Sequence, residues 1–328
     1  MNILIVSGFL GAGKTTFIQK LAEKSGREFA VMENEYGEAG IDGALLKRDR
    51  LKVWELTEGC ICCSLKSDFA SSILTIANTL APEYLIVEPT GVGLLSAVLN
   101  NIGKIEYDRI QLLEPVTVVD VHCVEHYLKE FGDIYADQLK NTPRILLSKI
   151  ENTSAEELDR ITAILRAVNP HAEILNTPYQ NQPEDWWHRL LQTPLNKQRT
   201  IVLPEKDHAP DLENISIADI AVDTVNELLE LLIALLRGYF GAVYRAKGFV
   251  SIGGQWTKFD IVDKQYTVAV CDPMPEAKAV IIGQKLNRER LHKAFTAAAP
   301  LLYRPYTANP GAEYGSKPVK YFPTSSVR

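Results

Sequence analysis

The sequence has few cysteines, no long apolar run and no excess of basic residues. Only five of its 328 residues are cysteine, so a disulfide framework of the kind found in small secreted proteins is not expected. We find no run of about 18 apolar residues that could span a membrane. The first residues also lack the basic and small-residue regions of an export signal. We therefore expect a cytoplasmic protein with no membrane partner.

Acidic residues outnumber basic residues, 41 to 35, and the formal net charge is -6 at pH 7. Because a nucleic-acid surface normally carries clustered Lys and Arg, we do not expect a nucleic-acid partner. The hydrophobic share of 46% and the charged share of 23% are typical of a soluble globular protein. The length exceeds what one core usually supports, so we expect two domains.

Apolar runs alternate with helical patterns over roughly the first 180 residues. The runs lie at 2–8, 29–34, 83–88, 114–120 and 143–148, and the helical patterns lie at 15–26, 68–82 and 154–170. This alternation predicts a doubly wound, mostly parallel α/β sheet. From about residue 200, closely spaced strand patterns and two helical patterns predict a smaller C-terminal α+β domain with a largely antiparallel sheet. We assign 1–195 to the first domain, 210–300 to the second and 301–328 to an extended or disordered tail.

Residues 8–15, GFLGAGKT, fit the pattern G-x4-G-K-[ST] between a predicted strand and a predicted helix. Such a loop holds phosphates with its backbone N–H groups, while Lys14 neutralises phosphate charge and the Thr15 hydroxyl can bind Mg²⁺. A glycine-rich turn without a ligand is the alternative, but it gives no packing reason for Gly-Lys-Thr. The candidate nucleotide-binding residues here are Gly8, Gly11, Ala12, Gly13, Lys14, Thr15 and Thr16.

Glu88 ends a predicted strand and begins the sequence Glu-Pro-Thr-Gly. A carboxylate in this place can hold Mg²⁺ or its waters beside Thr15. Gly91 can donate its N–H group to a γ-phosphate. The alternative for Glu88 is a strand-end carboxylate that faces solvent. We expect Lys14 and Glu88 to take part in catalysis.

Ser-Lys-Ile-Glu at 148–151 follows a predicted strand where guanine-binding proteins carry Asn-Lys-x-Asp. Ser148, Lys149 and Glu151 are therefore candidate base-binding residues. The Glu151 carboxylate lies one methylene further from the backbone than that of Asp, so its loop must shift to keep two hydrogen bonds to guanine. We expect guanine, and adenine or a relaxed base preference stays open.

Three of the cysteines cluster at Cys60, Cys62 and Cys63. Adjacent cysteines bridge each other only with strain, and a reducing compartment disfavours stable disulfides. Buried unreactive thiols are another alternative. Since Zn²⁺ prefers four tetrahedral S, N or O ligands, the cluster predicts a thiolate metal site completed by a residue from elsewhere.

An acidic stretch after the second predicted strand could supply that further ligand. It contains Glu33, Glu35, Glu38 and Asp42. The alternative is a solvated acidic loop, which is what charge runs usually form. Glu38 or Asp42 could instead position the attacking water in catalysis.

The segments GFLGAGKTT, ENEYGE, GCICC, EPTG and SKIE together resemble the CobW family of P-loop GTPases over nearly the whole chain. The resemblance implies a GTP-hydrolysing metallochaperone or metal insertase that binds Zn²⁺ or Co²⁺. It favours Cys62 and Cys63 as metal ligands, and Glu33 and then Glu38 as metal-associated acids, while composition adds Cys60. Two features depart from the family pattern: Glu151 replaces an aspartate, and the His-rich stretch between domains is absent.

We expect GTP with Mg²⁺ to order the loop at 33–42 and the loop after Cys63, and hydrolysis to release the metal to a client metalloprotein. A nucleotide-dependent homodimer is a further expectation. Intrinsic turnover should be slow, because no arginine in the 33–42 loop can act on the phosphate. The alternative function is a metal-buffering or regulatory nucleotide-binding protein without productive turnover.

Three other segments carry expectations of their own. We expect residues 186–188, Trp-Trp-His, to belong to a packing helix. His122, Cys123 and His126 should be ordinary helix surface rather than a second metal site. Residues 244–247, which include Arg245 and Lys247, should face either a client protein or solvent at a strand edge.

Overall fold

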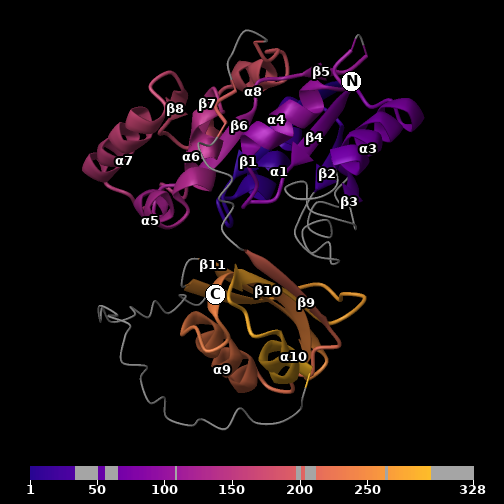
Figure 1. Ribbon diagram of the computed structural model, residues 1–328, viewed down its shortest axis with the longest axis vertical. Helices are drawn as coiled ribbons and strands as arrows, with labels where there is room; N and C mark the ends of the chain where they lie inside the picture. Colours follow the sequence, from indigo (N-terminus) through magenta and orange to yellow (C-terminus); the bar gives the residue numbers. More distant parts are fainter. Residues whose placement is uncertain are drawn as a thin grey trace, which may run out of the picture.

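The computed structural model describes residues 1–33, 51–55, 66–107, 109–196, 201–203, 212–262 and 265–296, with only the backbone described at 51–55 and 66–69. These residues form two domains, each with its own sheet (Figure 1). The doubly wound first domain and the smaller α+β second domain agree with the prediction.

The first domain contains a parallel sheet with the strand order β3-β2-β4-β1-β6-β7-β8, and β5 pairs with β1. Each strand is short and apolar, and the residues of β1 after Asn2 are all buried. This burial fits a sheet with helices on both faces. The strands are β1 (Asn2–Gly8), β2 (Phe29–Glu33), β3 (Leu51–Glu55), β4 (Tyr84–Glu88), β5 (Gln111–Leu112), β6 (Val116–Asp120), β7 (Arg144–Ser148) and β8 (Glu173–Leu175).

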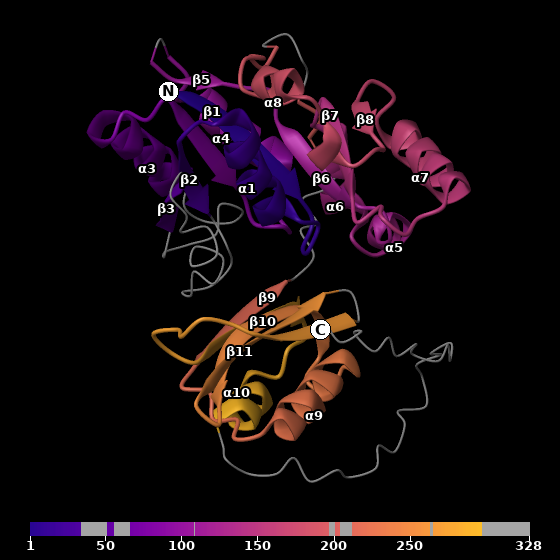
Figure 2. The same ribbon diagram turned by 180° about the vertical axis from the view of Figure 1, so that it is seen from behind.

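Helices cover both faces of this sheet (Figures 1 and 2). Phe17 and Trp187 belong to the core on one face, and Ile73 and Leu99 belong to the core on the other. The helices are α1 (Lys14–Ser25), α3 (Lys66–Thr79), α4 (Leu95–Gly103), α5 (Val124–Glu130), α6 (Gly132–Lys140), α7 (Ala155–Val168) and α8 (Glu184–Leu190), with a 3-10 turn η1 (Tyr179–Asn181). Our sequence analysis had not identified β3, β5, α4 or α6.

The second domain contains an antiparallel sheet with the order β12-β11-β10-β13-β9. Gly253 and Gly254 have φ values of 58° and 82°, the positive values required by a two-residue hairpin turn between β10 and β11. The elements are β9 (Glu213–Ala218), α9 (Val225–Leu236), β10 (Ala242–Ile252), β11 (Gln255–Val262), β12 (Gln265–Val270), β13 (Lys278–Gln284) and α10 (Arg288–Thr296).

The two faces of the second sheet have different neighbours. On one face, Ala246 and Ile281 pack in a core with Leu228 of α9 and Leu291 of α10. On the other face, Phe249 joins a core that includes residues of the first domain. The second sheet therefore lies between its own helices and the first domain, as both ribbon views show (Figures 1 and 2).

Candidate nucleotide and metal site

The loop between β1 and α1 has a backbone that only glycine allows at two of its positions. Gly8 has a φ of 145°, and a Cβ atom there would lie 2.4 Å from the backbone oxygen of Val118. Gly13 has a φ of 95° and immediately precedes α1. The loop therefore wraps closely at the positive end of a helix, the arrangement that binds phosphate with backbone N–H groups.

Lys14 lies inside this loop. Its Nζ atom donates hydrogen bonds to the backbone oxygens of Gly8 at 3.1 Å and Phe9 at 3.4 Å. The same Nζ atom lies 3.7 Å from Oε1 of Glu88. The structure therefore brings together the candidate lysine and the candidate carboxylate. Glu88 is largely buried, so it is not the solvent-facing side chain of the alternative interpretation.

The segment after Glu88 lies against the phosphate loop. A Cβ atom on Gly91 would lie 2.8 Å from the backbone nitrogen of Leu10. The Gln138 side chain of α6 holds this segment, because its Nε2 atom donates to the backbone oxygens of Gly91 at 3.1 Å and Gly93 at 2.9 Å. Gln138 is almost fully buried.

Asp137, the neighbour of Gln138, binds the chain a few residues further on, at the start of α4. Its Oδ2 atom accepts a hydrogen bond from the Ser96 backbone at 3.1 Å. Burial raises the pKa of the Asp137 carboxyl, and the hydrogen bonds from the start of α4 oppose that shift. Our sequence analysis missed both residues. The signal it could have used is an Asp-Gln pair within an otherwise amphipathic segment.

The candidate base-binding residues separate into different roles. The Ser148 hydroxyl donates to the backbone oxygen of Ala12 at 2.7 Å, so it ties β7 to the phosphate loop. Lys149 has a φ of 59°, and its Nζ atom lies 2.6 Å from Oδ2 of Asp120. Asp120 lies at the end of β6 and its carboxylate is buried. Our sequence analysis did not identify this partner of Lys149.

Glu151 is exposed at the start of the loop that follows β7. It lies close enough to Tyr179 to affect the phenol. Burial raises the pKa of Tyr179 to about 12, and the charge of Glu151 adds to that effect. The Glu151 side chain is accessible to a ligand because it is exposed.

Thr15 and Thr16, the remaining residues of the motif, lie in the first turn of α1. Thr15 is half-buried and Thr16 is exposed. Ala12 and Gly11 precede them, and the Ala12 side chain is buried. The Thr15 hydroxyl thus comes from the same helical turn as Lys14, as a Mg²⁺ ligand beside a phosphate must.

Glu33 is the candidate metal-associated acid that the structure describes. It ends β2, is only 5% exposed, and pairs in register with Glu88 of β4. Glu55 of β3 is its register partner on the other side. Three neighbouring parallel strands therefore end in glutamate at the carboxyl edge of the sheet.

The other candidate metal residues lie outside the described part of the chain. They are Glu35, Glu38, Asp42, Cys60, Cys62 and Cys63. Within the described residues, no group of three or more His, Cys, Asp or Glu side chains is placed to hold a metal ion.

The expectation for residues 244–247 was wrong. Arg245 is 9% exposed and Lys247 is 4% exposed, in the central strand β10, so neither residue faces solvent. The Tyr244 ring lies 4.7 Å from that of Phe131 in the first domain. These residues face the first domain, because the sheet face that carries them packs against it.

The expectation for residues 186–188 was correct, and the expectation for residues 122–126 was correct only in part. Trp186 and Trp187 are buried in α8, and the Trp187 ring stacks on Phe17 of α1. His122 is exposed and precedes α5, and His126 lies within α5, 3.2 Å from Glu130. Cys123 is buried in the core, so it is not the helix surface residue that we expected.

Residues 2–176 match the family model described as CobW/HypB/UreG, nucleotide-binding domain, and residues 221–299 match the cobalamin synthesis protein cobW C-terminal domain. The chain belongs to the CobW/HypB/UreG family. The family membership predicted from the sequence is therefore confirmed, together with the two-domain fold class.

Curated relatives of this CobW/HypB/UreG chain carry names that mention zinc and GTPase activity. Zinc chaperone YjiA of Escherichia coli (strain K12) is 26% identical over 312 residues, which cover 89% of this chain and 97% of the relative. Zinc chaperone YeiR of the same organism is 33% identical over 155 residues, 46% of this chain and 47% of the relative. Zinc-regulated GTPase metalloprotein activator 1 of Dictyostelium discoideum is 28% identical over 216 residues, 54% of this chain and 46% of the relative.

One match among solved structures covers most of both chains. The Zn(II)-bound YjiA GTPase from E. coli aligns with a TM-score of 0.44 and 22% identity over 90% of this chain and 97% of that one. The names of the curated relatives are those of zinc chaperones and of a zinc-regulated GTPase.

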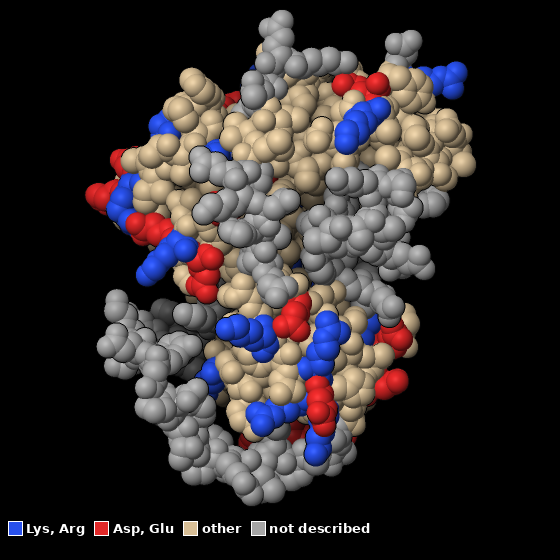
Figure 3. Space-filling model, in the orientation of Figure 1, with Lys and Arg blue, Asp and Glu red and all other residues tan. Residues whose placement is uncertain are grey.

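Two observations concern the expectation that the protein has neither a nucleic-acid partner nor a membrane partner. On the face shown in Figure 3, Lys and Arg side chains of the second domain are interspersed with Asp and Glu instead of forming one basic stripe. Among the described residues, no helix is both long and apolar enough to cross a membrane.

Proposed function

We propose that this protein is a GTP-hydrolysing metallochaperone that couples its nucleotide state to the transfer of a transition metal. The observation that carries the proposal is the register of Glu33 with Glu88 at the carboxyl edge of the sheet. Glu88 contacts the lysine of the phosphate loop, and Glu33 begins the acidic segment that the family resemblance associates with metal. One edge of one sheet would thus carry residues of both proposed sites.

The proposed roles at the nucleotide follow from the positions of the side chains. Lys14, which bonds to the loop's own carbonyls, would move its ammonium group to the terminal phosphates. Thr15 and Glu88 would hold Mg²⁺, which when bound neutralises charge on the triphosphate. Gly91 would donate its N–H group to the γ-phosphate. Ser148, whose hydroxyl donates to the backbone oxygen of Ala12, would fix the distance between the base-binding loop and the phosphate loop.

The proposed cargo site uses the cysteine cluster. Cys60, Cys62 and Cys63 would bind Zn²⁺, or Co²⁺, with a carboxylate from Glu33 or Glu38. Because Glu33 is almost fully buried beside Glu88, a bound cation there would offset the repulsion between two neighbouring carboxylates. Either Glu38 or Asp42 would position the attacking water. A client metalloprotein would then receive the metal, and a nucleotide-dependent homodimer belongs to the same proposal.

The test of this coupling is the Zn²⁺ affinity of the full chain, measured with GDP and with a non-hydrolysable GTP analogue. We expect the two affinities to differ by about tenfold or more, a coupling free energy of at least about 1.4 kcal/mol. Cys62→Ser and Glu33→Gln should weaken Zn²⁺ binding, while Cys271→Ser, in the second domain, should leave it unchanged. Equal affinities in the two nucleotide states would defeat the proposal, since a ligand that does not distinguish two states cannot shift them.

Multiple-turnover phosphate release from GTP and from ATP completes this experiment. We expect GTP to be hydrolysed in preference to ATP, with Glu151 accepting hydrogen bonds from guanine. Equal rates would show that Glu151 does not select the base. Nucleotide binding without sustained phosphate release would favour the metal-buffering or regulatory function instead.

A further inference from the structure

The second domain contacts the phosphate loop directly through Val262 and reaches it indirectly through Phe131 of the first domain. A Cβ atom on Gly11 would lie 2.5 Å from Cγ1 of Val262, so the Val262 side chain already touches the loop. The ring of Phe9, also in the loop, lies 4.7 Å from that of Phe131, and Phe131 lies 4.7 Å from Tyr244 of β10. The end of β11 therefore packs on the loop that is proposed to hold the triphosphate, and the start of β10 packs on Phe131, which contacts the same loop.

Arg245 lies directly beside the first of these contacts. It pairs with Val262 in the register of the antiparallel strands β10 and β11. Side chains of directly opposed residues share one face of the sheet, with Cβ atoms about 4.5–5.5 Å apart. Since Val262 touches Gly11, the long Arg245 side chain starts within reach of the loop. Lys247 follows two residues later on the same face.

Arg245 lies in a buried and charged environment. Arg245 and Lys247 are almost fully buried, and a buried cation is costly unless negative charge opposes it. Asp260 lies on this face, with its Oδ1 atom 3.7 Å from Nε of Arg245. This Nε–Oδ1 distance is longer than a hydrogen bond, so this contact with Asp260 is a long ion pair. A planar guanidinium matches the geometry of phosphate oxygens.

We propose that Arg245 is a catalytic residue supplied by the second domain, which contacts the terminal phosphate of the bound nucleoside triphosphate. The inference rests on the proposed GTP hydrolysis and names a residue that acts in it. The oxygen of water bonds to the γ-phosphorus, the bond from the γ-phosphorus to the β–γ bridging oxygen breaks, and the products are GDP, inorganic phosphate and a proton. Arg245 stays protonated and stabilises the charge that spreads over the transferred phosphoryl group.

This role changes one expectation from the sequence. Slow intrinsic turnover was expected because the 33–42 loop has no arginine, whereas β10 presents one to the phosphate loop from a separate domain. GDP lacks the terminal phosphate. Contact between Arg245 and the nucleotide would therefore exist in the triphosphate state alone, so that hydrolysis would also loosen the contact between the domains.

The test is single-turnover hydrolysis of GTP with Mg²⁺ by the full chain. Arg245→Gln should slow hydrolysis by at least about 10²-fold, because an arginine in this role contributes about 10³–10⁵ in rate. Arg245→Lys should also be slow, since an ammonium group lacks the guanidinium geometry. The affinity for GDP should change by less than about threefold in both variants. Arg288→Gln is the matched control, because Arg288 is an exposed arginine of the same domain.

A second variant separates a catalytic role from the loss of the ion pair. Arg245→Gln with Asp260→Asn removes both charges, so it should fold like the wild type and remain slow. Recovery of wild-type turnover in this double variant would overturn the inference, because the defect would then come from the Asp260 charge. Melting curves show whether each variant is folded. If Arg245→Gln is unfolded, the hydrolysis rates of the double variant and of Arg245→Lys test the inference instead.

The remaining outcomes distinguish this inference from the proposed function. Wild-type hydrolysis with an equally fast Arg245→Gln variant would overturn the role of Arg245 and leave the proposed function standing. A wild-type protein that neither binds nor hydrolyses GTP would overturn both.

Discussion

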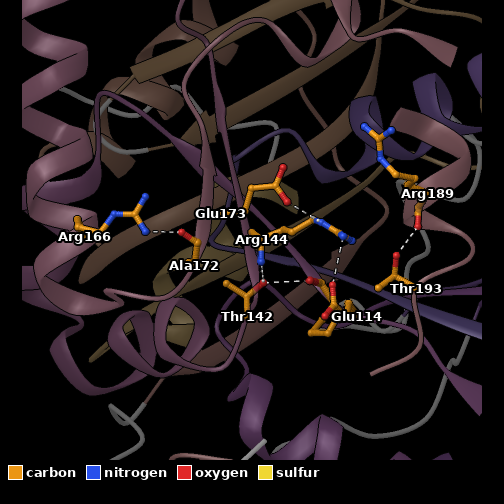
Figure 4. A network of polar contacts seen from close by, with 9 residues as sticks. Glu114, Thr142, Arg144, Arg166, Ala172, Glu173, Arg189 and Thr193 are labelled. Carbon is orange, nitrogen blue, oxygen red and sulfur yellow. Dashed lines mark hydrogen bonds and ion pairs between the residues drawn. The ribbon is translucent and has the colours of Figure 1, made fainter. Parts of the chain in front are cut away.

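The two edges of the parallel sheet in the first domain are built differently. At the carboxyl edge, glycines with positive φ shape the loop after β1, and buried carboxylates end β2 and β4. At the amino edge, charged and hydroxyl side chains join neighbouring strands to each other (Figure 4). Arg144 at the start of β7 contacts Glu114 at 3.3 Å and Glu173 at 3.0 Å.

This difference separates the residues that serve a ligand from those that serve stability. A binding edge must leave backbone N–H groups and charges available, so its side chains cannot all be used in mutual contacts. The amino edge has no such demand. The Thr142 hydroxyl there donates to the backbone oxygen of Pro115 and accepts from the backbone N–H of Arg144, which links β6 and β7. Substitutions at the two edges should therefore affect different measurements.

The largest effect should come from Gly8→Ala at the carboxyl edge. The added methyl group would lie 2.4 Å from the Val118 backbone oxygen, at a φ of 145°. Because neither the backbone oxygen nor the strained φ can adjust easily, we expect a loss of about 3 kcal/mol of stability. GTP affinity should fall by about 100-fold or more, since the loop must move away from β6. Isothermal titration and urea unfolding measure the two quantities.

Gly103→Ala is the control for this prediction. Gly103 ends α4, and a Cβ atom there would meet no other atom within 4 Å. Its stability should change by less than about 0.5 kcal/mol, with GTP affinity unchanged. Wild-type affinity in Gly8→Ala would mean that the backbone at Gly8 does not shape the phosphate site.

An intermediate effect is expected from Gln138→Leu, which frees the segment after Glu88. The change removes hydrogen bonds to the backbone oxygens of Gly91 and Gly93, and buried groups that lose their partners cost about 1–3 kcal/mol. We expect a stability loss of about 2 kcal/mol. The kcat for GTP should fall while GDP affinity stays the same, because Gly91 is proposed to contact the γ-phosphate only.

Gln182→Leu provides the comparison for Gln138→Leu. Gln182 makes one side-chain hydrogen bond, to Thr177 at 3.2 Å, in an exposed loop. Its loss should cost less than about 0.5 kcal/mol. If both variants lost stability but kept the wild-type kcat, Gln138 would be a structural residue with no positioning role.

The carboxyl edge was the easier of the two to predict from the sequence. The loop from Gly8 to Thr15 requires particular residue types at fixed spacings, because a phosphate must fit against its backbone. Glu88 was predicted for a similar reason, since it ends an apolar run. The roles of these residues remain proposals, but their positions around one loop agree with the prediction.

The rest of the site depends on contacts between distant segments. Helix α6 carries Asp137 and Gln138 on a buried side, so the apolar pattern that identifies a helix is interrupted by the residues that matter there. Arg245 and Lys247 looked like exposed strand residues because charged side chains usually are. Their burial comes from the packing of one domain on the other, which no local pattern encodes.

The smallest effect should come from Arg144→Met at the amino edge. The substitution keeps the apolar volume and removes the ion pairs to Glu114 and Glu173, of which Glu173 is 58% exposed. Partly exposed pairs contribute little each, so we expect a loss of about 1 kcal/mol in the free energy of unfolding. Urea unfolding measures this loss.

For Arg144→Met, GTP affinity and the rate of GTP hydrolysis test whether the amino edge of the sheet affects ligand binding. They should remain at wild-type values, because Arg144 lies at the opposite end of β7 from Ser148, which bonds to the phosphate loop. Arg160→Met is the matched variant, since Arg160 on α7 pairs with Glu125 and Glu157 at a more exposed position, and it should lose less stability. If Arg144→Met instead lowered turnover as strongly as Gln138→Leu, the two edges would be coupled through β7, and binding and stability would not be separate properties of this sheet.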